Sequence, residues 1–204
     1  MKVGMYSPTE RIIDEYLILR CQDGDMTAFS DLIKRWQQPF QRFAMIVTKD
    51  KDLAADIVQD SWIKILKSLP RLRDPVSFQA WAYRIVNNQC MDVLKRRSRY
   101  RVVTTIPSVK INPIGALEER DYIQSLLAQL PYKHRSVLAL HYLLGFDIGE
   151  IARITKSPKG TVKSRLFKAR EKFRILLDGG EQNRPGDAHE PVRQTNSGSL
   201  ASSF

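Results

Sequence analysis

Apolar residues recur every three or four positions along most of this chain, and stretches of alternating apolar and polar residues are nearly absent. The first pattern predicts amphipathic helices, whereas the second is the one expected of half-buried strands. β-branched residues cluster only in RVVTTI and VKI, between residues 101 and 111, where Pro107 and Pro113 interrupt the segment. The sequence therefore predicts an all-α protein.

The apolar periodicity defines a first helical unit over residues 10–97. Its helices are expected around residues 12–17, 29–36, 40–47, 53–69 and 78–97, with Pro39 starting or kinking the third. Residues 98–116 are basic, interrupted by prolines and poor in helical periodicity, so they are predicted to form a flexible linker.

A second helical unit is predicted over residues 117–177. Its helices are expected at 118–129, 132–144, 148–154 and 158–177. Gly179 and Gly180 are expected to end the last helix, and residues 178–204 have almost no large apolar side chains, which predicts a disordered tail.

The last two predicted helices have the features of a helix-turn-helix, in which two short helices are joined by a tight turn. Asp147 is a predicted N-cap, and Glu150 three residues later can complete a capping box. Ser157 and Pro158 are predicted as the N-cap and first residue of the following helix. A buried face is expected at Val162, Leu166, Ala169 and Phe173.

The opposite face of this last helix is polar and basic, as in a helix that enters a DNA groove. Its candidate DNA-binding residues are Lys159, Thr161, Lys163, Ser164, Arg165 and Lys168. A basic, solvated surface helix is the alternative, but the caps, the turn and the apolar spacing together favour DNA binding.

The distribution of charge supports a polyanionic partner. The 33 Lys and Arg against 22 Asp and Glu give a formal charge of +11. Residues 95–117 hold six basic and no acidic residues, and residues 153–174 hold nine basic and one acidic residue. Two basic blocks separated by a nearly neutral segment suggest two contacts with one extended anion.

Two long stretches of the sequence are similar to a known family. DLAADIVQDSWIKILKSLPRLRDPVSFQAWAYRIVNNQCMDVLKRR, followed by LPYKHRSVLALHYLLGFDIGEIARITKSPKGTVKSRLFKAREKFR, resembles regions two and four of the extracytoplasmic-function (ECF) group of bacterial sigma factors. The resemblance covers about residues 21–177. It implies a promoter-specificity subunit that binds the RNA polymerase core enzyme through the largest-subunit coiled coil and the flap. It also implies recognition of the -35 and -10 promoter elements, DNA melting, and an anti-sigma factor as a further partner.

The resemblance also assigns residues to these roles. In DIVQD the exposed members Asp56, Gln59, Asp60 and Lys64 would bind core polymerase, whereas Trp62 and Leu66 are expected to be packed. The -10 element would contact the loop RLRDPVS and the helix after it, through Arg71, Arg73, Ser77, Tyr83, Arg84, Asn87, Asn88, Asp92, Lys95 and Arg96. Arg84, Asn88, Asp92 and Lys95 also form one polar stripe by their spacing.

Two aromatic residues of this helix could stack on unpaired bases. Trp81 falls on the apolar face and is expected in the core, so Tyr83 is the preferred, more exposed candidate. The family match has departures: Asp60 stands for the usual glutamate, and the turn ITKS lacks the usual glycine.

Enzymatic alternatives lack a constellation of catalytic residues. His134 and His141 lie seven positions apart with no third ligand nearby, so neither a metal nor a cofactor is expected. Cys21 and Cys90 have no short spacing, which argues against a disulfide framework and favours a cytoplasmic protein. No apolar run is long enough to span a membrane. The stronger rival is a helix-turn-helix transcriptional regulator that is not a polymerase subunit, although residues 1–95 show no dimerisation or ligand site.

Overall fold

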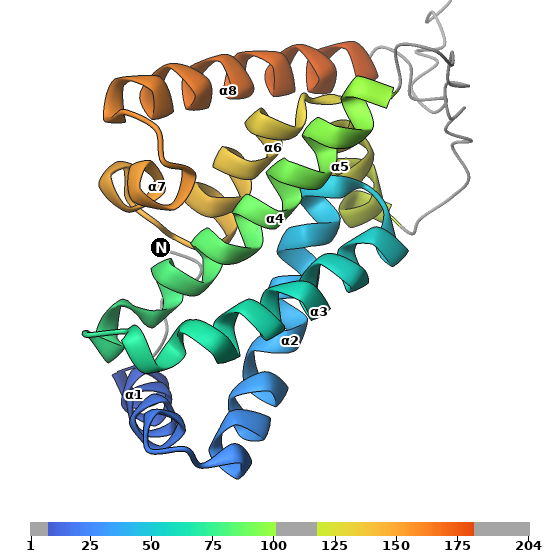
Figure 1. Ribbon diagram of the computed structural model, residues 1–204. Coiled ribbons are helices and arrows are strands. Elements are labelled where there is room, and N and C mark those ends of the chain that lie inside the picture. Colours follow the sequence, from blue (N-terminus) through green and yellow to red (C-terminus); the bar gives the residue numbers. More distant parts are fainter. Residues whose placement is uncertain (1–7, 101–117, 182–204) are drawn as a thin grey trace, which may run out of the picture.

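The computed structural model describes residues 8–100 and 118–181, and every regular element in these ranges is a helix (Figure 1). The predicted all-α fold is therefore confirmed. The first unit consists of α1 (Pro8–Gln22), α2 (Met26–Thr48), α3 (Lys51–Ser68) and α4 (Phe78–Tyr100), with the short 3₁₀ turns η1 (Leu69–Arg71) and η2 (Pro75–Ser77) between α3 and α4.

Helix α2 is one continuous helix, so the expected start of a new helix at Pro39 is wrong. Asp25 caps its N-terminus by accepting hydrogen bonds from the backbone N–H groups of Thr27 and Ala28. A proline inside a helix costs about 3 kcal/mol because it removes a backbone donor and crowds the preceding turn. Burial of Trp36 and Phe40 on either side of Pro39 offsets this cost.

Aromatic side chains fill the centre of the first unit. The ring of Tyr83 contacts the rings of Phe40 at 5.1 Å, Phe43 at 5.4 Å and Trp36 at 6.1 Å between centroids, all at nearly perpendicular angles. Such edge-to-face pairs are favoured by the aromatic quadrupole. These contacts join α2 to α4 and fix the side of α4 that is buried.

The second unit consists of α5 (Glu118–Gln129), α6 (Tyr132–Leu138), the π-helical segment η4 (Ala139–Leu143), α7 (Ile148–Thr155) and α8 (Lys159–Glu181). The helix predicted over 132–144 is thus α-helical only to Leu138, and the N–H of Leu144 donates to the carbonyl of Ala139, five residues earlier, at 3.1 Å.

Two predicted boundaries are wrong. Helix α4 continues to Tyr100, so its last turn occupies the start of the predicted linker at 98–116. Helix α8 continues through Gly179 and Gly180 to Glu181, although these glycines were expected to end it. The rest of the predicted linker and tail lies outside the described residues.

The two units pack against each other and share one apolar core, an arrangement that the sequence does not predict. In Figure 1, α8 crosses above α4, and α6 and α7 lie between them. Helix α4 contacts α7, and α2 contacts α6. Tyr83 of α4 meets Phe146 of the second unit at 5.7 Å between ring centroids. Within the described part of the chain, none of the helices is both long and apolar enough to traverse a lipid bilayer.

Candidate nucleic-acid interface

Helices α7 and α8 form the predicted helix-turn-helix. The capping box is present: Glu150 N donates to Asp147 Oδ1 and Asp147 N donates to Glu150 Oε2, each at 2.8 Å. The glycine-free turn is made by Lys156, which adopts the left-handed conformation at φ 49°. A lysine at this position fulfils the role that a glycine usually has after a helix.

The prediction that Ser157 is the N-cap of α8 and Pro158 its first residue is wrong by one position, and the Ser157 hydroxyl makes its hydrogen bonds elsewhere. Helix α8 begins at Lys159, and the carbonyl of Pro158 accepts from Val162 N at 3.1 Å. The Ser157 hydroxyl donates to the carbonyl of Thr155 at 3.2 Å and accepts from Arg165 Nη1 at 2.9 Å. Ser157 therefore connects the turn to the next helix through a side chain.

The buried and exposed faces of α8 agree with the prediction. Val162, Leu166 and Ala169 are buried, and Phe173 packs partly against the core. Of the six candidate DNA-binding residues, Lys159, Lys163, Ser164 and Lys168 are exposed. Thr161 and Arg165 are half-buried. The four exposed side chains are accessible to solvent, whereas the Arg165 side chain is bonded to Ser157 of the turn.

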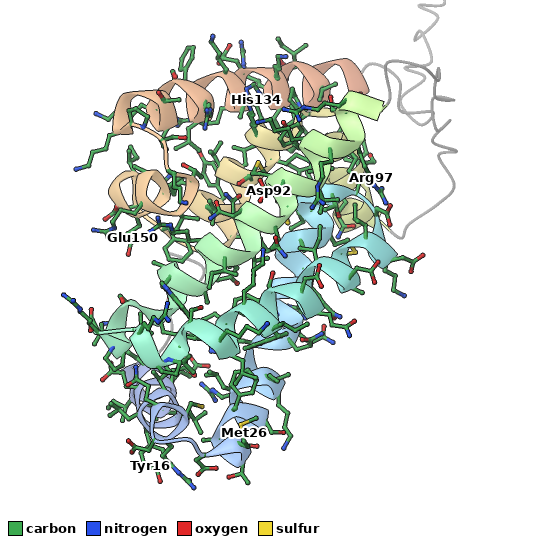
Figure 2. The ribbon with its side chains drawn as sticks, viewed as in Figure 1. Tyr16, Met26, Asp92, Arg97, His134 and Glu150 are labelled. Carbon is green, nitrogen blue, oxygen red and sulfur yellow. The ribbon has the colours of Figure 1, made fainter. Side chains whose placement is uncertain are left out.

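His134 of α6 lies next to α8 (Figure 2). Burial lowers the pKa of His134, and the positive charges of Lys172, Arg165 and Lys168 lower it further. Its buried Nδ1 has no hydrogen-bond partner among the described residues. The second unit therefore favours a neutral histidine next to its most basic helix.

The polar stripe of α4 is present. Arg84, Asp92 and Lys95 are exposed and Asn88 is half-buried, and the flanking Arg96 is exposed. Asn87, by contrast, is buried between the units, where its Oδ1 accepts a hydrogen bond from Ser136 Oγ at 2.7 Å.

Tyr83, expected to be the more exposed of the two α4 aromatic residues, is the more buried one, whereas Trp81 packs against the core as expected but is only half-buried. Tyr83 is fully buried among the rings of the core, and Trp81 is half-buried, with its ring 6.0 Å from that of Phe78. The face of α4 that carries Tyr83 is covered on both sides, by α2 and by Phe146 of the second unit. Trp81 is therefore the more accessible aromatic side chain.

The loop before α4 is held by hydrogen bonds from a side chain of α1 to its backbone. Gln22 Nε2 donates to the carbonyls of Leu69 at 3.1 Å and Leu72 at 2.7 Å. Arg71 and Arg73 point from this loop into solvent, while the half-buried Ser77 donates its hydroxyl proton to Asp74 O at 2.7 Å. The loop thus presents two cations beside the start of α4.

Helix α3 carries the predicted polymerase-binding face. Asp56, Gln59, Asp60 and Lys64 are exposed, and Lys64 Nζ donates to Gln89 Oε1 at 2.6 Å. The expected packing of Trp62 is confirmed, because its side chain is buried and its indole N–H donates to Gln37 Oε1 at 2.7 Å.

The expected packing of Leu66 is wrong. Leu66 is 40% exposed, and its neighbour Ile63, which the sequence did not single out, is 49% exposed. Both follow Asp56 and Asp60 along α3 at helical spacing, so the four side chains lie along one side. That spacing was the signal by which Ile63 could have been found.

Comparisons with known proteins agree with this geometry. Residues 32–100 match the family Sigma-70 region 2, and residues 120–173 match Sigma-70, region 4. The chain is 32% identical to the RNA polymerase sigma factor SigV of Bacillus subtilis over 143 residues, which cover 69% of this chain and 86% of SigV. It is 30% identical to the ECF RNA polymerase sigma-E factor of Salmonella typhimurium over 179 residues, covering 80% and 93%.

Two solved structures share the fold. The sigma factor RpoE of Bartonella quintana, crystallised with the anti-sigma factor NepR, matches with a TM-score of 0.61 and 26% identity, covering 74% of this chain and 96% of that one. CnrH, in complex with the cytosolic domain of CnrY, also has a TM-score of 0.61, at 24% identity, covering 82% and 98%.

The chain has two helical units in sequence order, and the second is a helix-turn-helix. Both units match sigma-70 regions in sequence, which defines a promoter-specificity subunit of RNA polymerase. The chain belongs to the sigma-70 family, in its ECF group. It is therefore a sigma factor, a non-enzymatic subunit that binds core RNA polymerase and promoter DNA to initiate transcription. The alternative of a helix-turn-helix regulator that is not a polymerase subunit does not account for the region 2 match.

Proposed function

We propose that three surfaces of this chain divide the work of a sigma factor, with region 2 in residues 10–97, a linker in 98–116 and region 4 in 117–177. The observation that carries the proposal is that an exposed mixed face on α3, a polar stripe on α4 and an exposed cationic face on α8 occur in one chain. Each has a composition suited to a different partner.

The α3 face is the proposed site for the coiled coil of the polymerase largest subunit. Asp56, Gln59 and Asp60 supply charge and hydrogen bonding, and the exposed Ile63 and Leu66 supply apolar area. Apolar side chains within a polar rim are typical of a protein interface. Lys64 lies at the edge of this face, and the region 4 unit is proposed to contact the polymerase flap.

The loop before α4 and the α4 stripe form the proposed -10 site. Opened DNA presents unstacked bases, which bind best to a cationic surface with an aromatic side chain. Trp81 takes the stacking role that the sequence had given to Tyr83, because Trp81 is the accessible ring. The proposed DNA-contacting residues are Arg71, Arg73, Ser77, Arg84, Asn88, Asp92, Lys95 and Arg96; Asn87 is left out because it is buried and bonded to Ser136.

The N-terminal half of α8 is the proposed -35 site. Lys159, Lys163, Ser164 and Lys168 are exposed on the first turns of the helix that would enter the major groove. Thr161 and Arg165 complete the set from half-buried positions. Lysines can bind guanine edges or phosphates, and the short serine allows close approach to the DNA.

An anti-sigma factor is the further proposed partner, and the cytoplasm the proposed place of action. RpoE of Bartonella quintana, which shares this fold at 26% identity, was solved with the anti-sigma factor NepR. The chemistry of polymerase and genome binding requires no membrane segment.

Core-enzyme pull-down and run-off transcription test the proposal. Asp60→Arg should weaken core binding by about tenfold or more, since reversing a charge at an interface can cost several kcal/mol. The matched control is Asp23→Arg, the same charge change at an exposed residue of the α1–α2 turn. Equal loss in both variants, or normal core binding by Asp60→Arg, would contradict the assignment of α3.

A further inference from the structure

A cavity of about 360 Å³ lies where helices α4, α6, α7 and α8 meet. Three of these helices each contribute one cation to its walls: Lys95 comes from α4, Lys133 from α6 and Arg165 from α8. Pockets that bind small molecules have volumes of about 300–1,000 Å³. The cavity is therefore large enough for a ligand, but only for a compact one.

The three cations have no counter-ions in the protein. Within residues 8–100 and 118–181, none of them forms an ion pair with a carboxylate. Asp92 of α4 (Figure 2) is the one carboxylate among the described residues that line the cavity, and the cations outweigh it. The cavity therefore has a surplus of positive charge.

Two of the cations are held in place by neighbouring side chains. Nη1 of Arg165 donates to Ser157 Oγ at 2.9 Å, which uses one of the five N–H donors of the guanidinium. Nζ of Lys133 lies 6.0 Å from the centre of the Tyr132 ring, the geometry of a cation–π contact. A ligand that binds side chains ordered in advance loses less free energy to their immobilisation.

The charge state of His134 gives separate evidence for a positive potential in this part of the protein. His134 precedes Arg135 on α6 and directly follows Lys133. Burial lowers its pKa, and the positive charges of Lys172, Arg165 and Lys168 lower it further. The cations beside the cavity are therefore close enough to disfavour a further positive charge.

The chemistry of the walls favours a phosphate ligand. Lysine and arginine side chains are donors without acceptors, so they require a ligand rich in acceptor oxygens. Arginine binds phosphate through two parallel hydrogen bonds, and lysine binds it as a point charge. Cations that approach from three helices suit an anion whose charge is spread over two linked phosphate groups better than a single small anion.

We propose that this cavity is a binding site for a diphosphate group, with Lys95, Lys133 and Arg165 as its ligands. The group is either free pyrophosphate or part of a nucleoside diphosphate. Lys95 and Arg165 also belong to the proposed DNA sites, whereas Lys133 belongs to none of the proposed DNA or polymerase surfaces. Lys133 therefore separates this site from DNA binding. The rival explanation is that the cations serve only DNA phosphates, in which case the free chain has no diphosphate site.

Isothermal titration calorimetry of the full free chain with inorganic pyrophosphate tests the proposal. The titration is run without divalent cations and at constant ionic strength, because a chain of formal charge +11 attracts anions in general. The expected result is saturable binding of one pyrophosphate per chain. Several weak sites, or no saturable binding, would overturn the proposal.

Lysine variants show whether the bound anion lies in the cavity. Lys133→Gln and Lys95→Gln should each weaken pyrophosphate binding by about tenfold or more, because each removes a charge-assisted hydrogen bond. Lys67→Gln is the matched control, since Lys67 is exposed on α3 and does not line the cavity, and its affinity should equal that of the wild type. Equal affinity in all three variants, or a loss in only one of the two cavity variants, would overturn the site. Circular dichroism checks that each variant is folded.

Two further ligands identify the chemistry of the bound anion. ADP carries the same diphosphate group on a nucleoside. Tighter binding of ADP than of pyrophosphate supports the nucleotide form of the proposal, and tighter binding of pyrophosphate supports the free anion. Citrate has a similar charge but only carboxylates, so citrate binding as tight as that of pyrophosphate would overturn the assignment to phosphate.

Run-off transcription with core enzyme, without added pyrophosphate, keeps this inference separate from the proposed function. A chain that binds pyrophosphate but does not initiate transcription would refute the proposed function and leave the site intact. A chain that initiates transcription but has no saturable pyrophosphate binding would overturn the site alone.

Discussion

Replacing Tyr83 by alanine should mainly affect stability, whereas replacing Trp81 by alanine should mainly affect function. Tyr83 is fully buried and contacts the rings of Phe40, Phe43 and Trp36, whereas Trp81 is half-buried beside Phe78. Tyr83→Ala should therefore act on the fold, and Trp81→Ala on DNA melting. The two residues are two positions apart on one helix, so each serves as the control for the other.

The magnitude follows from the contacts that each change removes. Truncating a fully buried large aromatic side chain to alanine costs about 3–5 kcal/mol. Domains of this size are stable by about 5–15 kcal/mol, so Tyr83→Ala removes about a fifth or more of the total. With a urea m-value of about 2 kcal/mol per molar, the unfolding midpoint should fall by about 2 M. Trp81→Ala should lower it by less than half as much, because part of that ring is already in solvent.

Urea unfolding followed by circular dichroism measures the first effect, and run-off transcription on duplex and on pre-melted templates measures the second. Trp81→Ala should lose transcription on duplex templates and regain much of it on pre-melted ones. Tyr83→Ala should lose activity on both templates as it unfolds. A Tyr83→Ala protein of normal stability that fails only on duplex templates would refute this reasoning.

Three further predictions concern the caps, the pH response and the thiols. Asp147→Ala should destabilise the protein by about 1–2 kcal/mol through loss of the capping box, measured by urea unfolding at pH 7. Hydrogen bonds from the backbone N–H groups of Glu150 and Gly149 lower the Asp147 pKa. The difference in unfolding free energy between wild type and Asp147→Ala should therefore shrink as the pH falls below about 4. A difference that does not change with pH would count against the cap. The His134 pKa is lowered in the fold, so wild-type stability should decrease as the pH drops below about 6.5, and His134→Gln should flatten that part of the profile; identical profiles would exclude His134. Cys90 is buried, with its pKa raised to about 12, so alkylation of the Cys90 thiol should occur only as the protein unfolds globally. Equal rates of Cys90 alkylation in native and unfolded protein would contradict its burial.

Local chemistry allowed much of the fold to be predicted. The Asp147 and Glu150 spacing specified a capping box, and the Val162, Leu166 and Ala169 spacing specified the buried side of α8. Such features depend on residues within one or two helical turns, so they can be recognised without knowing what packs against them. The helix content and the family membership followed from signals of this kind.

Packing between distant segments accounts for the failures. Pro39 alone favours a helix break, yet burial of its neighbours against α3 and α4 keeps α2 continuous. Tyr83 was expected to be exposed, but it is buried because the core surrounds the side of α4 on which Tyr83 lies. Leu66 was expected to be packed together with Trp62, four residues earlier, but its position on α3 leaves it 40% exposed.

The sequence by itself determined the helices, the helix-turn-helix and the assignment to the sigma-70 family, because these depend on local spacing and on matched motifs. Only the tertiary structure decided that Asn87 bonds Ser136, that Arg135 reaches the carbonyl of Val47, and that the two units share a core. These contacts join residues 49 and 88 positions apart. No periodicity encodes such contacts, because they depend on how two already formed surfaces fit together.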